Sequence, residues 1–334
     1  MRVPPPRIAV EPLPTPPTFS VVVPAFEAAG TISETLESVL AQSPPPREVI
    51  VVDDGSDDGI EEALGPFESR VRLIRHPVNR GVAAARNSGL RECSGDFVLV
   101  VDADDVLLPG RLAALGFLGR ERPDLDVLCT DVFFETDGQR QGRFYEQRQF
   151  PVDDQRGAIL EWCFPIHPAI RRERLEELGG FDESLPTAED WDCALRMVLS
   201  GSLAGLYDRP LELYRIRPGS LSDTRAGTLR DRVRMLEKAR SSAFLRPGDR
   251  PVLERSLRAQ HHRAVLAEAQ SALALGAADA RRRGLALARC PSAPAAERIW
   301  GLGLFALPRR SWNLLRRRGP GSQLQRVLPH GQGR

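Results

Sequence analysis

Short apolar runs, each followed by polar or acidic residues, recur along the first hundred residues. They cover residues 19–23, 48–52, 71–74 and 97–101. The last of these runs, F-V-L-V-V, is apolar at every position and rich in β-branched side chains. Continuous runs of this kind are typical of strands buried on both faces of a parallel sheet.

The segments between these runs have the spacing of helices. Residues 31–42 carry apolar side chains three and four positions apart, with Thr31 and Ser33 available as caps, and three prolines follow. Helices are also expected over residues 61–67 and 82–90. The alternation of strand and helix predicts an α/β fold with a mostly parallel sheet flanked by helices.

The rest of the chain divides into three further parts. Residues 1–18 are rich in proline and lack periodicity, which predicts a disordered or extended leader. A strand is expected over residues 126–134, followed by a polar loop over residues 135–149. Alanine-rich segments at 227–244 and 251–275 predict a helical extension. We therefore expect an α/β domain over residues 19–224, with halves 19–110 and 111–224, and an extension over residues 225–334.

Charge is distributed unevenly along the chain. The net charge is +1, but residues 225–334 contain 23 Lys+Arg and 7 Asp+Glu, a net of +16, so residues 1–224 carry −15. A basic tail on an acidic body indicates an anionic partner, with a solvated arginine-rich surface as the alternative. No recognised nucleic-acid motif accompanies the arginines, so we expect no nucleic-acid partner.

Part of this tail has the composition of a membrane-binding surface. The apolar segment 299–307 and Trp312 alternate with arginines at 281–283, 309–310 and 316–318. We expect residues 281–318 to bind an anionic membrane surface, with insertion of Trp300, Leu302, Leu304 and Phe305. The competing interpretation packs these apolar residues against the α/β domain and leaves the arginines in water.

The cellular setting follows from two further features. The five cysteines are scattered and lack C-x-x-C spacing, which argues for a reducing compartment and against a disulfide framework or a zinc site. Neither a secretory signal nor an apolar run near the ~20 residues of a membrane helix is visible. We expect a cytoplasmic protein, peripheral on the inner membrane face if the tail binds lipid.

Two clusters of acids follow two of the expected strands. D-D-G-S-D-D stands at residues 53–58, and D-A-D-D at residues 102–105. Ligands of parallel sheets bind at the carboxyl ends of the strands, so both clusters are expected at one edge. A divalent cation held by Asp102, Asp104 or Asp105 would relieve their repulsion, with a nucleotide diphosphate supplying further oxygens. The alternative for each cluster is an acidic turn that caps the next helix.

Six segments in order resemble the family 2 glycosyltransferases with the GT-A fold. They are V-V-V-P-A-F-E (21–27), V-V-D-D-G-S-D-D (51–58), N-R-G-V-A-A-A-R-N-S-G-L (79–90), D-A-D-D (102–105), G-G-F-D-E-S-L-P-T-A-E-D-W-D (179–192) and Y-R-I-R-P-G-S-L-S (214–222). The resemblance spans about residues 19–222. Glycine-rich loops of dinucleotide dehydrogenases and P-loop enzymes are absent from the sequence.

The resemblance implies a role for each matching residue. In chain order, Pro24, Phe26 and Glu27 would line the nucleotide pocket, Asp54 would contact the base or ribose, and Asn79 and Arg86 would lie on the donor side. Asp102 would contact ribose and stand beside the metal, Asp104 would hold Mg²⁺ or Mn²⁺, and Asp190 would be the catalytic base.

Two positions depart from the family pattern. Glu27 stands where the family often has Asn, and Arg217 stands where it often has a metal-assisting His. An arginine cannot ligate a metal, but it can pair with phosphate oxygens, so we also expect Arg217 at the diphosphate.

The acceptor side is less specified by the sequence. Thr187 can cap a helix whose first turn holds Asp190, with Glu189 as the fallback base; a plain acidic helix N-terminus is the alternative. His167, between two prolines, either borders the acceptor site or makes a structural hydrogen bond. Trp162 and Trp191 either stack on a sugar or belong to the core.

The residues together predict a metal-dependent, inverting glycosyltransferase. It would move a sugar from a UDP- or dTDP-type donor to a glycan or lipid-linked hydroxyl, in the synthesis of a surface polysaccharide or glycolipid. The alternative is a catalytically inactive nucleotide-sugar-binding protein of the same fold that acts as a partner or scaffold. Arg217 is the feature that favours this alternative.

Overall fold

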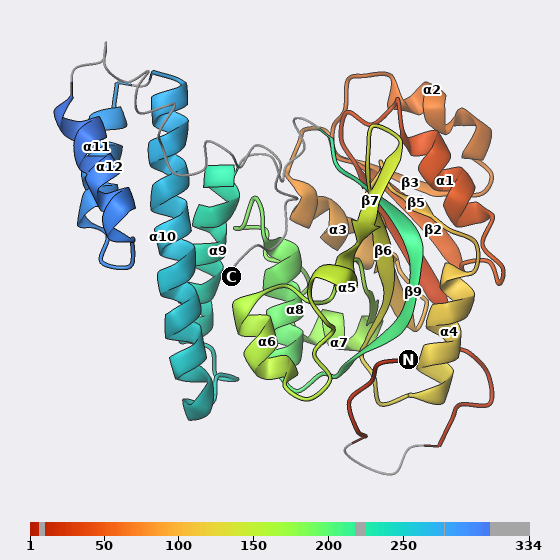
Figure 1. Cartoon of the computed structure of the whole chain (residues 1–334). Helices are drawn as coiled ribbons and strands as arrows, with labels where there is room; N and C mark the ends of the chain where they lie inside the picture. The colour runs from red at the N-terminus through yellow and green to blue at the C-terminus, as the bar shows by residue number, and fades with distance from the viewer. Residues whose placement is uncertain (7–10, 218–224, 277, 308–334) are drawn as a thin grey trace. The chain divides into compact units, whose positions relative to one another are not determined.

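The computed structural model describes residues 1–6, 11–217, 225–276 and 278–307. The chain forms two compact units, Met1–Arg217 and Pro218–Arg334. The first unit is an α/β domain and the second is helical (Figure 1). The boundary that we predicted after residue 224 lies at the end of a segment outside the described ranges.

The first half of the sheet is parallel, as predicted. Strands β1 (Phe19–Ala25), β2 (Glu48–Asp53), β3 (Arg72–Arg75) and β4 (Phe97–Val100) lie in the order β3-β2-β1-β4. β1 is flanked by β2 and β4, and both neighbours run parallel to it. The carboxyl ends of β2 and β4 therefore lie on either side of the end of β1.

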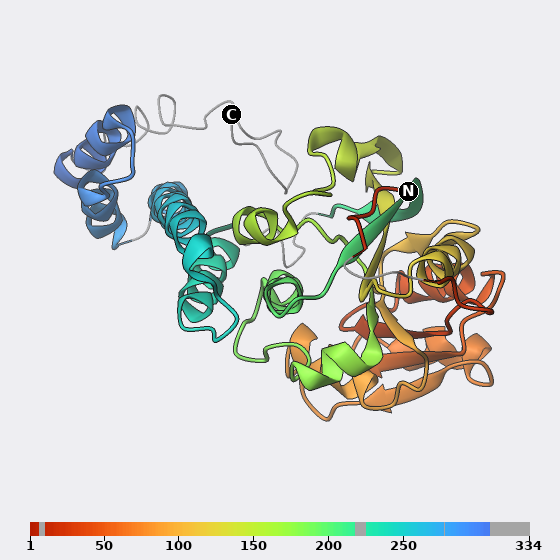
Figure 2. The same cartoon turned by 90° about the horizontal axis from the view of Figure 1, so that it is seen from below.

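The second half of the sheet is mixed. It consists of β8 (Ala169–Arg171), β6 (Val127–Thr136), β9 (Ala204–Arg215), β5 (Val106–Leu107) and β7 (Gln139–Arg143). β8 is antiparallel to both β4 and β6, whereas β6 and β9 are parallel and lie side by side in both views (Figures 1 and 2). The carboxyl-terminal part of β9 pairs with β5, which follows the second acid cluster directly.

Helices cover both faces of the parallel half. Alternate residues of β1, such as Val21 and Val23, pack with α1 (Ile32–Leu40), α2 (Ile60–Leu64) and α4 (Arg111–Glu121) in the main core. The intervening Val22 faces α3 (Val82–Leu90), where a Cβ on Gly89 would lie 2.4 Å from Val22 Cγ1. A glycine is therefore required for α3 to approach β1 this closely.

Two helix predictions need correction in detail. Residues 61–67 were expected as one helix, but α2 gives way to a 3₁₀ turn, η1 (Gly65–Phe67), with Pro66 in its first turn. Thr31 occupies the N-cap position of α1, yet its side chain makes no cap hydrogen bond. Its hydroxyl donates instead to Ala103 O at 2.8 Å, which ties α1 to the second acid cluster.

The segment predicted as a polar loop over residues 135–149 contains regular structure. It includes the strand β7 and the short helix α5 (Phe144–Gln147). β7 pairs with β6 off the main path of the sheet, and its residues Gln139, Arg140 and Gln141 are exposed, so the sequence shows no apolar strand pattern there. At its end, Arg143 forms an ion pair with the buried Asp131 at 2.7 Å.

The acceptor half contributes three further helices, α6 (Gln155–Glu161), α7 (Arg172–Glu177) and α8 (Glu189–Leu199). The N-cap of α8 is Ala188, with a left-handed φ of 64° and no side-chain cap hydrogen bond, so the expected cap at Thr187 is wrong by one residue. The expected acidic first turn is confirmed, because Glu189 begins the helix and Asp190 follows it.

The described part of the leader, residues 1–6 and 11–18, has no regular structure beyond one isolated bridge, and it bends at residues 14 and 15. Arg2 forms an isolated bridge with Leu206 of β9 and an ion pair with Asp208 at 2.9 Å. Leu13 N donates to Arg120 O at 2.9 Å. These contacts count against the disordered alternative for these residues.

The second unit is a set of packed helices, as predicted from the alanine-rich pattern. It comprises α9 (Arg225–Arg240), η3 (Pro247–Asp249), α10 (Arg250–Ala274), α11 (Ala280–Arg289) and α12 (Ala295–Ala306). Helices α9 and α10 lie side by side in both views (Figures 1 and 2). Within the described ranges, the protein has no helix that is both long and apolar enough to cross a membrane.

Candidate active site

The two acid clusters lie at the same edge of the sheet, as the strand pattern predicted. Ala25 at the end of β1 pairs in register with Asp53, and Val22 pairs with Val100 two residues before Asp102. The segment after β1 joins the first cluster: Glu27 N donates to Ser56 Oγ, and Asp57 N donates to Glu27 Oε1, both at 3.0 Å. Of the other expected pocket residues here, Pro24 is buried and Phe26 is half exposed.

Asp54 in the first cluster is buried and surrounded by protein donors. Its Oδ1 lies 2.6 Å from His76 Nδ1 and accepts from Arg80 N at 3.0 Å, and its Oδ2 accepts from Gly81 N at 2.7 Å. The exposed Asn79 also accepts from Gly81 N, at 3.0 Å. Asp54 thus fixes the loop before α3. Its expected contact with a base or ribose stays a prediction.

The second cluster is more accessible at two of its three acids. The side chains of Asp102 and Asp104 are each 34% exposed, whereas that of Asp105 is 2% exposed. Asp105 Oδ1 accepts from Arg215 N at 2.8 Å, which fixes the end of β9. Arg217 Nε lies 3.8 Å from Asp104 Oδ2.

Charges in the second cluster shift the acidity of its members. Burial and the neighbouring Asp102 raise the pKa of Asp104. Burial raises the pKa of Asp105 well above its usual value. For Asp102 burial acts in the same direction, but the charges of Arg86 and His167 outweigh it and lower the pKa. Carboxylates that resist ionisation together are a favourable environment for a divalent cation.

Arg86 joins this cluster to the start of α8. Its Nη1 donates to Glu189 Oε1 at 2.5 Å, and its Nη2 donates to Asp102 Oδ1 at 3.0 Å. The guanidinium also lies 5.5 Å from the centre of the Phe181 ring. Arg86 is buried and engaged by these groups, so its expected contact with the nucleotide or diphosphate stays a prediction.

The two acids that begin α8 differ in environment. Glu189 is buried, and burial raises its pKa to about 7 against the charge of Arg86. Asp190 is exposed, and its Oδ1 accepts from Trp191 N at 2.7 Å. Of the two carboxylates, that of Asp190 is accessible to solvent and that of Glu189 is not. The role of Asp190 as catalytic base stays a prediction.

His167 is largely buried and lies beside Asp102 and Asp105 of the second cluster. Its Nδ1 is 2.8 Å from Glu212 Oε1, and its Nε2 is 3.7 Å from Asp102 Oδ2. Burial alone would lower the pKa of His167, but the neighbouring carboxylates, Glu212 first, raise it to about 10. The expected structural hydrogen bond is therefore present, and the imidazole also contacts the acid cluster.

Several carboxylates in this region have the ligand types that Mg²⁺ and Mn²⁺ prefer. Asp102, Asp105 and His167 bring ligand atoms within 4.8 Å of one another. Asp104, the expected ligand, is not in that group, but its partly exposed carboxylate faces outward beside Asp102. Oxygen ligands at Asp102 and Asp104 fit a hard divalent cation, whose remaining positions a diphosphate would fill.

Two buried residues near the site were missed by sequence reasoning. Arg111 at the start of α4 and Glu212 in β9 form an ion pair in which both side chains are fully buried. Locally, an arginine after Pro109-Gly110 resembles a surface helix start, and a glutamate in a strand resembles an exposed position. Their pairing depends on residues about a hundred positions apart.

The expected aromatic sites differ in burial. Trp191 is 3% exposed and its Nε1 donates to Ile159 O at 2.7 Å, so it belongs to the core. Trp162 is half-buried and packs between Phe144, Phe164 and the guanidinium of Arg148.

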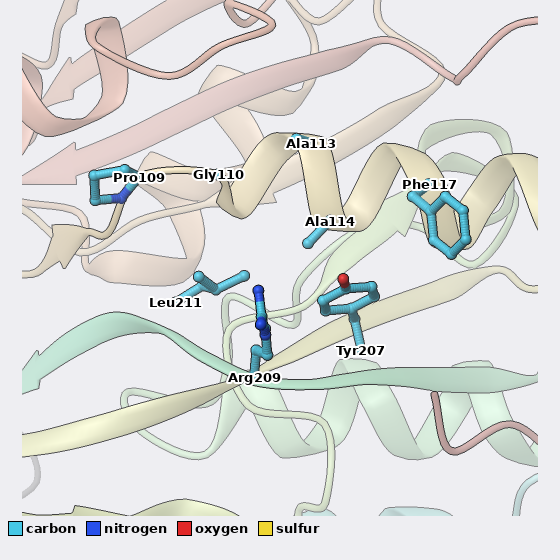
Figure 3. Close-up of a pocket in the computed structure, with 8 residues that line it drawn as sticks. All are labelled: Pro109, Gly110, Ala113, Ala114, Phe117, Tyr207, Arg209 and Leu211. Carbon is cyan, nitrogen blue, oxygen red and sulfur yellow. The ribbon is translucent and has the colours of Figure 1, made fainter.

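A cavity of about 280 Å³ lies between the start of α4 and β9. Figure 3 shows Tyr207 and Arg209 pointing from β9 toward the helix, with Phe117 at one end and Pro109 at the other. Its lining includes no residue of either acid cluster, so we do not assign it to the candidate active site.

Comparison with known proteins agrees with this geometry. The family described as Glycosyl transferase family 2 matches residues 20–179. The succinoglycan biosynthesis protein ExoO of Rhizobium meliloti is 31% identical over 226 residues, which cover 62% of this chain and 63% of ExoO. The chain thus spans less than two thirds of that relative's length.

Solved structures share the fold. S. aureus TarS 1–349 in complex with UDP-GlcNAc has a TM-score of 0.62 at 19% identity, covering 89% of this chain and 92% of that one. The mannosyltransferase PcManGT from Pyrobaculum calidifontis, in complex with GDP-Man and Mn²⁺, has a TM-score of 0.58 at 22% identity, covering 92% and 88%.

The first unit therefore has the GT-A fold of these transferases, with both acid clusters at the carboxyl ends of its parallel strands. Residues 20–179 thus match glycosyltransferase family 2, which confirms the resemblance that the ordered motifs indicated.

Proposed function

We propose that this chain transfers a sugar from a UDP- or dTDP-type donor to an acceptor hydroxyl, with a divalent cation and with inversion at the anomeric carbon. The observation that carries the proposal is the guanidinium shared by Glu189 and Asp102. Arg86 links Glu189 to Asp102, which belongs to the second acid cluster. The exposed Asp190 is the next residue after Glu189, so Arg86 ties the expected base to the expected metal site.

The chemistry assigns a separate task to each side chain. The acceptor oxygen attacks the anomeric carbon, the bond to the diphosphate oxygen breaks, and the acceptor proton passes to Asp190. A cation held by Asp104 and Asp102 would neutralise the charge that develops on the leaving diphosphate. Arg217, half-exposed beside Asp104, is suited to pair with phosphate oxygens.

The comparisons support the donor class and the setting. TarS and PcManGT bind nucleotide sugars, and the second was solved with Mn²⁺. ExoO acts in succinoglycan biosynthesis. We infer an acceptor in the synthesis of a surface polysaccharide or glycolipid.

The test is the Asp190→Asn variant. Affinity for UDP with Mn²⁺, measured by calorimetry, should stay near wild type, while UDP release from a UDP-sugar falls on the order of 10²–10⁴-fold. Asp153→Asn, which changes an exposed acid before α6, is the control. NMR of the released sugar should show the inverted anomer. Wild-type protein that binds UDP but never turns over the donor would instead be the inactive binding protein, which Arg217 favours.

The basic tail motivates a second proposal, that the second unit binds an anionic membrane surface at the cytoplasmic face. Helix α12 exposes Ile299, Leu302 and Phe305, at 68%, 49% and 43%, on one side. Arg298 on the same helix and Arg281 and Arg282 on α11 are exposed as well. Apolar insertion combined with basic charge matches an anionic lipid surface.

For two residues, Trp300 and Leu304, the prediction that they insert into a membrane is wrong. Trp300 is 7% exposed and Leu304 is fully buried, and both pack within the helical unit. Their burial follows from helical spacing, since they point opposite to Leu302. The arginines at 309–310 and 316–318 and Trp312 lie outside the described residues.

Vesicle sedimentation tests the membrane proposal. The triple variant Ile299→Ser, Leu302→Ser and Phe305→Ser should lose binding to phosphatidylserine-containing vesicles at low salt while keeping its circular dichroism. Truncation before α12 is a poorer test because it removes core residues. Binding equal to that of wild type would rule out this face as the contact.

A further inference from the structure

A buried chain of charges lies beneath the second acid cluster. Arg111 and Glu212 form a fully buried ion pair between α4 and β9. Both members also hold His167: Arg111 Nη2 donates to His167 O at 2.6 Å, and Glu212 Oε1 lies 2.8 Å from His167 Nδ1. The backbone and the ring of one loop histidine are thus fixed by the same pair.

The backbone of His167 is itself unusual. Its φ is +37°, in the left-handed region that a residue with a Cβ rarely adopts. A strained conformation of this kind costs about 1–3 kcal/mol and persists only where the surroundings impose it. Strain held by a buried ion pair beside a ligand site indicates a functional position more than simple filling of the core.

The free side of the imidazole faces Asp102. Nε2 lies 3.7 Å from Asp102 Oδ2, while Arg86 holds Asp102 Oδ1 at 3.0 Å from the opposite side. The ring also lies 5.1 Å from the ring of Tyr214, which limits its rotation. Each oxygen of Asp102 therefore has its own nitrogen neighbour, Arg86 Nη2 at Oδ1 and His167 Nε2 at Oδ2.

We propose that His167 is a positioning residue that fixes the carboxylate of Asp102 for donor binding, with the Arg111–Glu212 pair as its support. The inference rests on the proposed function, since Asp102 is expected to meet the ribose and the metal. Without His167, Asp102 would be held through Oδ1 by Arg86 alone, and its second oxygen would no longer be fixed beside Asp104 and Asp105. Second-layer partners of this kind change ligand affinity by about 10–100-fold in metal sites.

Two conservative variants separate the two ends of the ring. His167→Asn keeps an amide near the position of Nδ1, toward Glu212, and removes the group that faces Asp102. His167→Gln extends an amide toward the position of Nε2. We expect UDP affinity, measured by calorimetry, to fall about tenfold in His167→Asn and to stay within about threefold in His167→Gln.

Coupling to Asp102 distinguishes positioning from a structural role. In a double-mutant cycle with Asp102→Asn, adding His167→Asn should weaken UDP binding by no more than about twofold further. UDP binding is measured with Mn²⁺ and with EDTA, because a positioning residue acts in both whereas a metal ligand acts only with Mn²⁺. His262→Asn, which alters another histidine–carboxylate pair at 2.6 Å in the second unit, should leave UDP binding unchanged.

The outcomes are separable. If wild-type protein binds no nucleotide diphosphate, the proposed function fails and this inference falls with it. If wild type binds UDP and folded His167→Asn binds it equally well, or if the two changes are additive, only the positioning role is lost. Should His167→Asn fail to fold, His167→Gln alone tests the inference: because Gln extends an amide toward the position of Nε2, a loss of UDP affinity of about tenfold or more would contradict the positioning role.

Discussion

The clusters after β2 and β4 read alike in the sequence but differ in the folded protein. In the first, Asp53 and Asp54 are buried, and backbone donors from nearby residues occupy them: Ser56 N reaches Asp53 Oδ1 at 2.9 Å, and Gly81 N reaches Asp54 Oδ2 at 2.7 Å. In the second, Asp102 and Asp104 remain a third exposed.

The two clusters differ in whether donors of the protein already occupy their carboxylates. Donors to the first cluster are mostly main-chain groups of its own loops, so its charge is already stabilised. The second is faced by side chains from distant segments, Arg86, His167 and Arg217, and burial still raises the pKa of Asp104. In the second cluster, the partly exposed Asp102 and Asp104 leave negative charge at the end of β4 that an added cation would stabilise.

The largest expected effect concerns Asp104. Asp104→Asn should lower donor turnover by on the order of 10²–10³-fold, because several kcal/mol of charge stabilisation at the diphosphate depends on the metal. Thermal unfolding should stay at or above the wild-type temperature, since a repelling acid is removed. Unchanged UDP–Mn²⁺ affinity in calorimetry would show that Asp104 does not hold the metal.

Asp54→Asn should show the opposite signature. The free energy of unfolding in urea should fall by about 2–3 kcal/mol, because charge-assisted hydrogen bonds to the loop before α3 are weakened. UDP affinity of the folded protein should stay within about threefold of wild type. Lost UDP affinity at unchanged stability would favour the base or ribose contact that the family resemblance implies.

Arg217→His tests whether the arginine beside Asp104 limits metal binding at the second cluster. A histidine 3.8 Å from Asp104 would replace a repelling cation by a potential ligand, so Mn²⁺ affinity should rise about tenfold. Paramagnetic titration of Mn²⁺ measures this directly. A rise in Mn²⁺ affinity with a fall in turnover would indicate that Arg217 itself acts on the diphosphate.

The smallest effect is expected at the rim of the first cluster. Asp58 Oδ2 accepts from Ala29 N at 2.7 Å at an exposed position. Asp58→Ala should lower the free energy of unfolding by roughly 0.5–1 kcal/mol and leave turnover unchanged. A large loss of turnover would mean that the first cluster also has a part in catalysis.

Local patterns made much of the first unit predictable. Buried strands such as β1 and β4 were found within one or two residues, because runs of β-branched residues have few other stable environments. The ordered motifs also identified the acid edge and the acidic first turn of α8. These features depend on residues close together in the chain.

Features that depend on distant partners were not predictable. The strand β7 has no apolar pattern, because Gln139, Arg140 and Gln141 are exposed and Arg143 pairs with the buried Asp131 of β6. The sequence around Arg111 and the sequence around Glu212 contain no pattern that predicts their ion pair. Likewise, the exposed side of α12 could not be predicted, because it depends on the packing of Trp300 and Leu304 within the helical unit.

The charged triad of Arg111, Glu212 and His167 has a consequence for divergence within the family. Losing Arg111 or Glu212 leaves the other charge buried without its ion-pair partner, at about 3–5 kcal/mol, whereas a joint replacement by apolar residues of similar size is often neutral. Single substitutions that lead from the intact charged group to an apolar replacement therefore pass through a destabilised protein. We expect lineages that descend from this protein to change acceptor preference through surface loops, while the triad either persists whole or disappears whole.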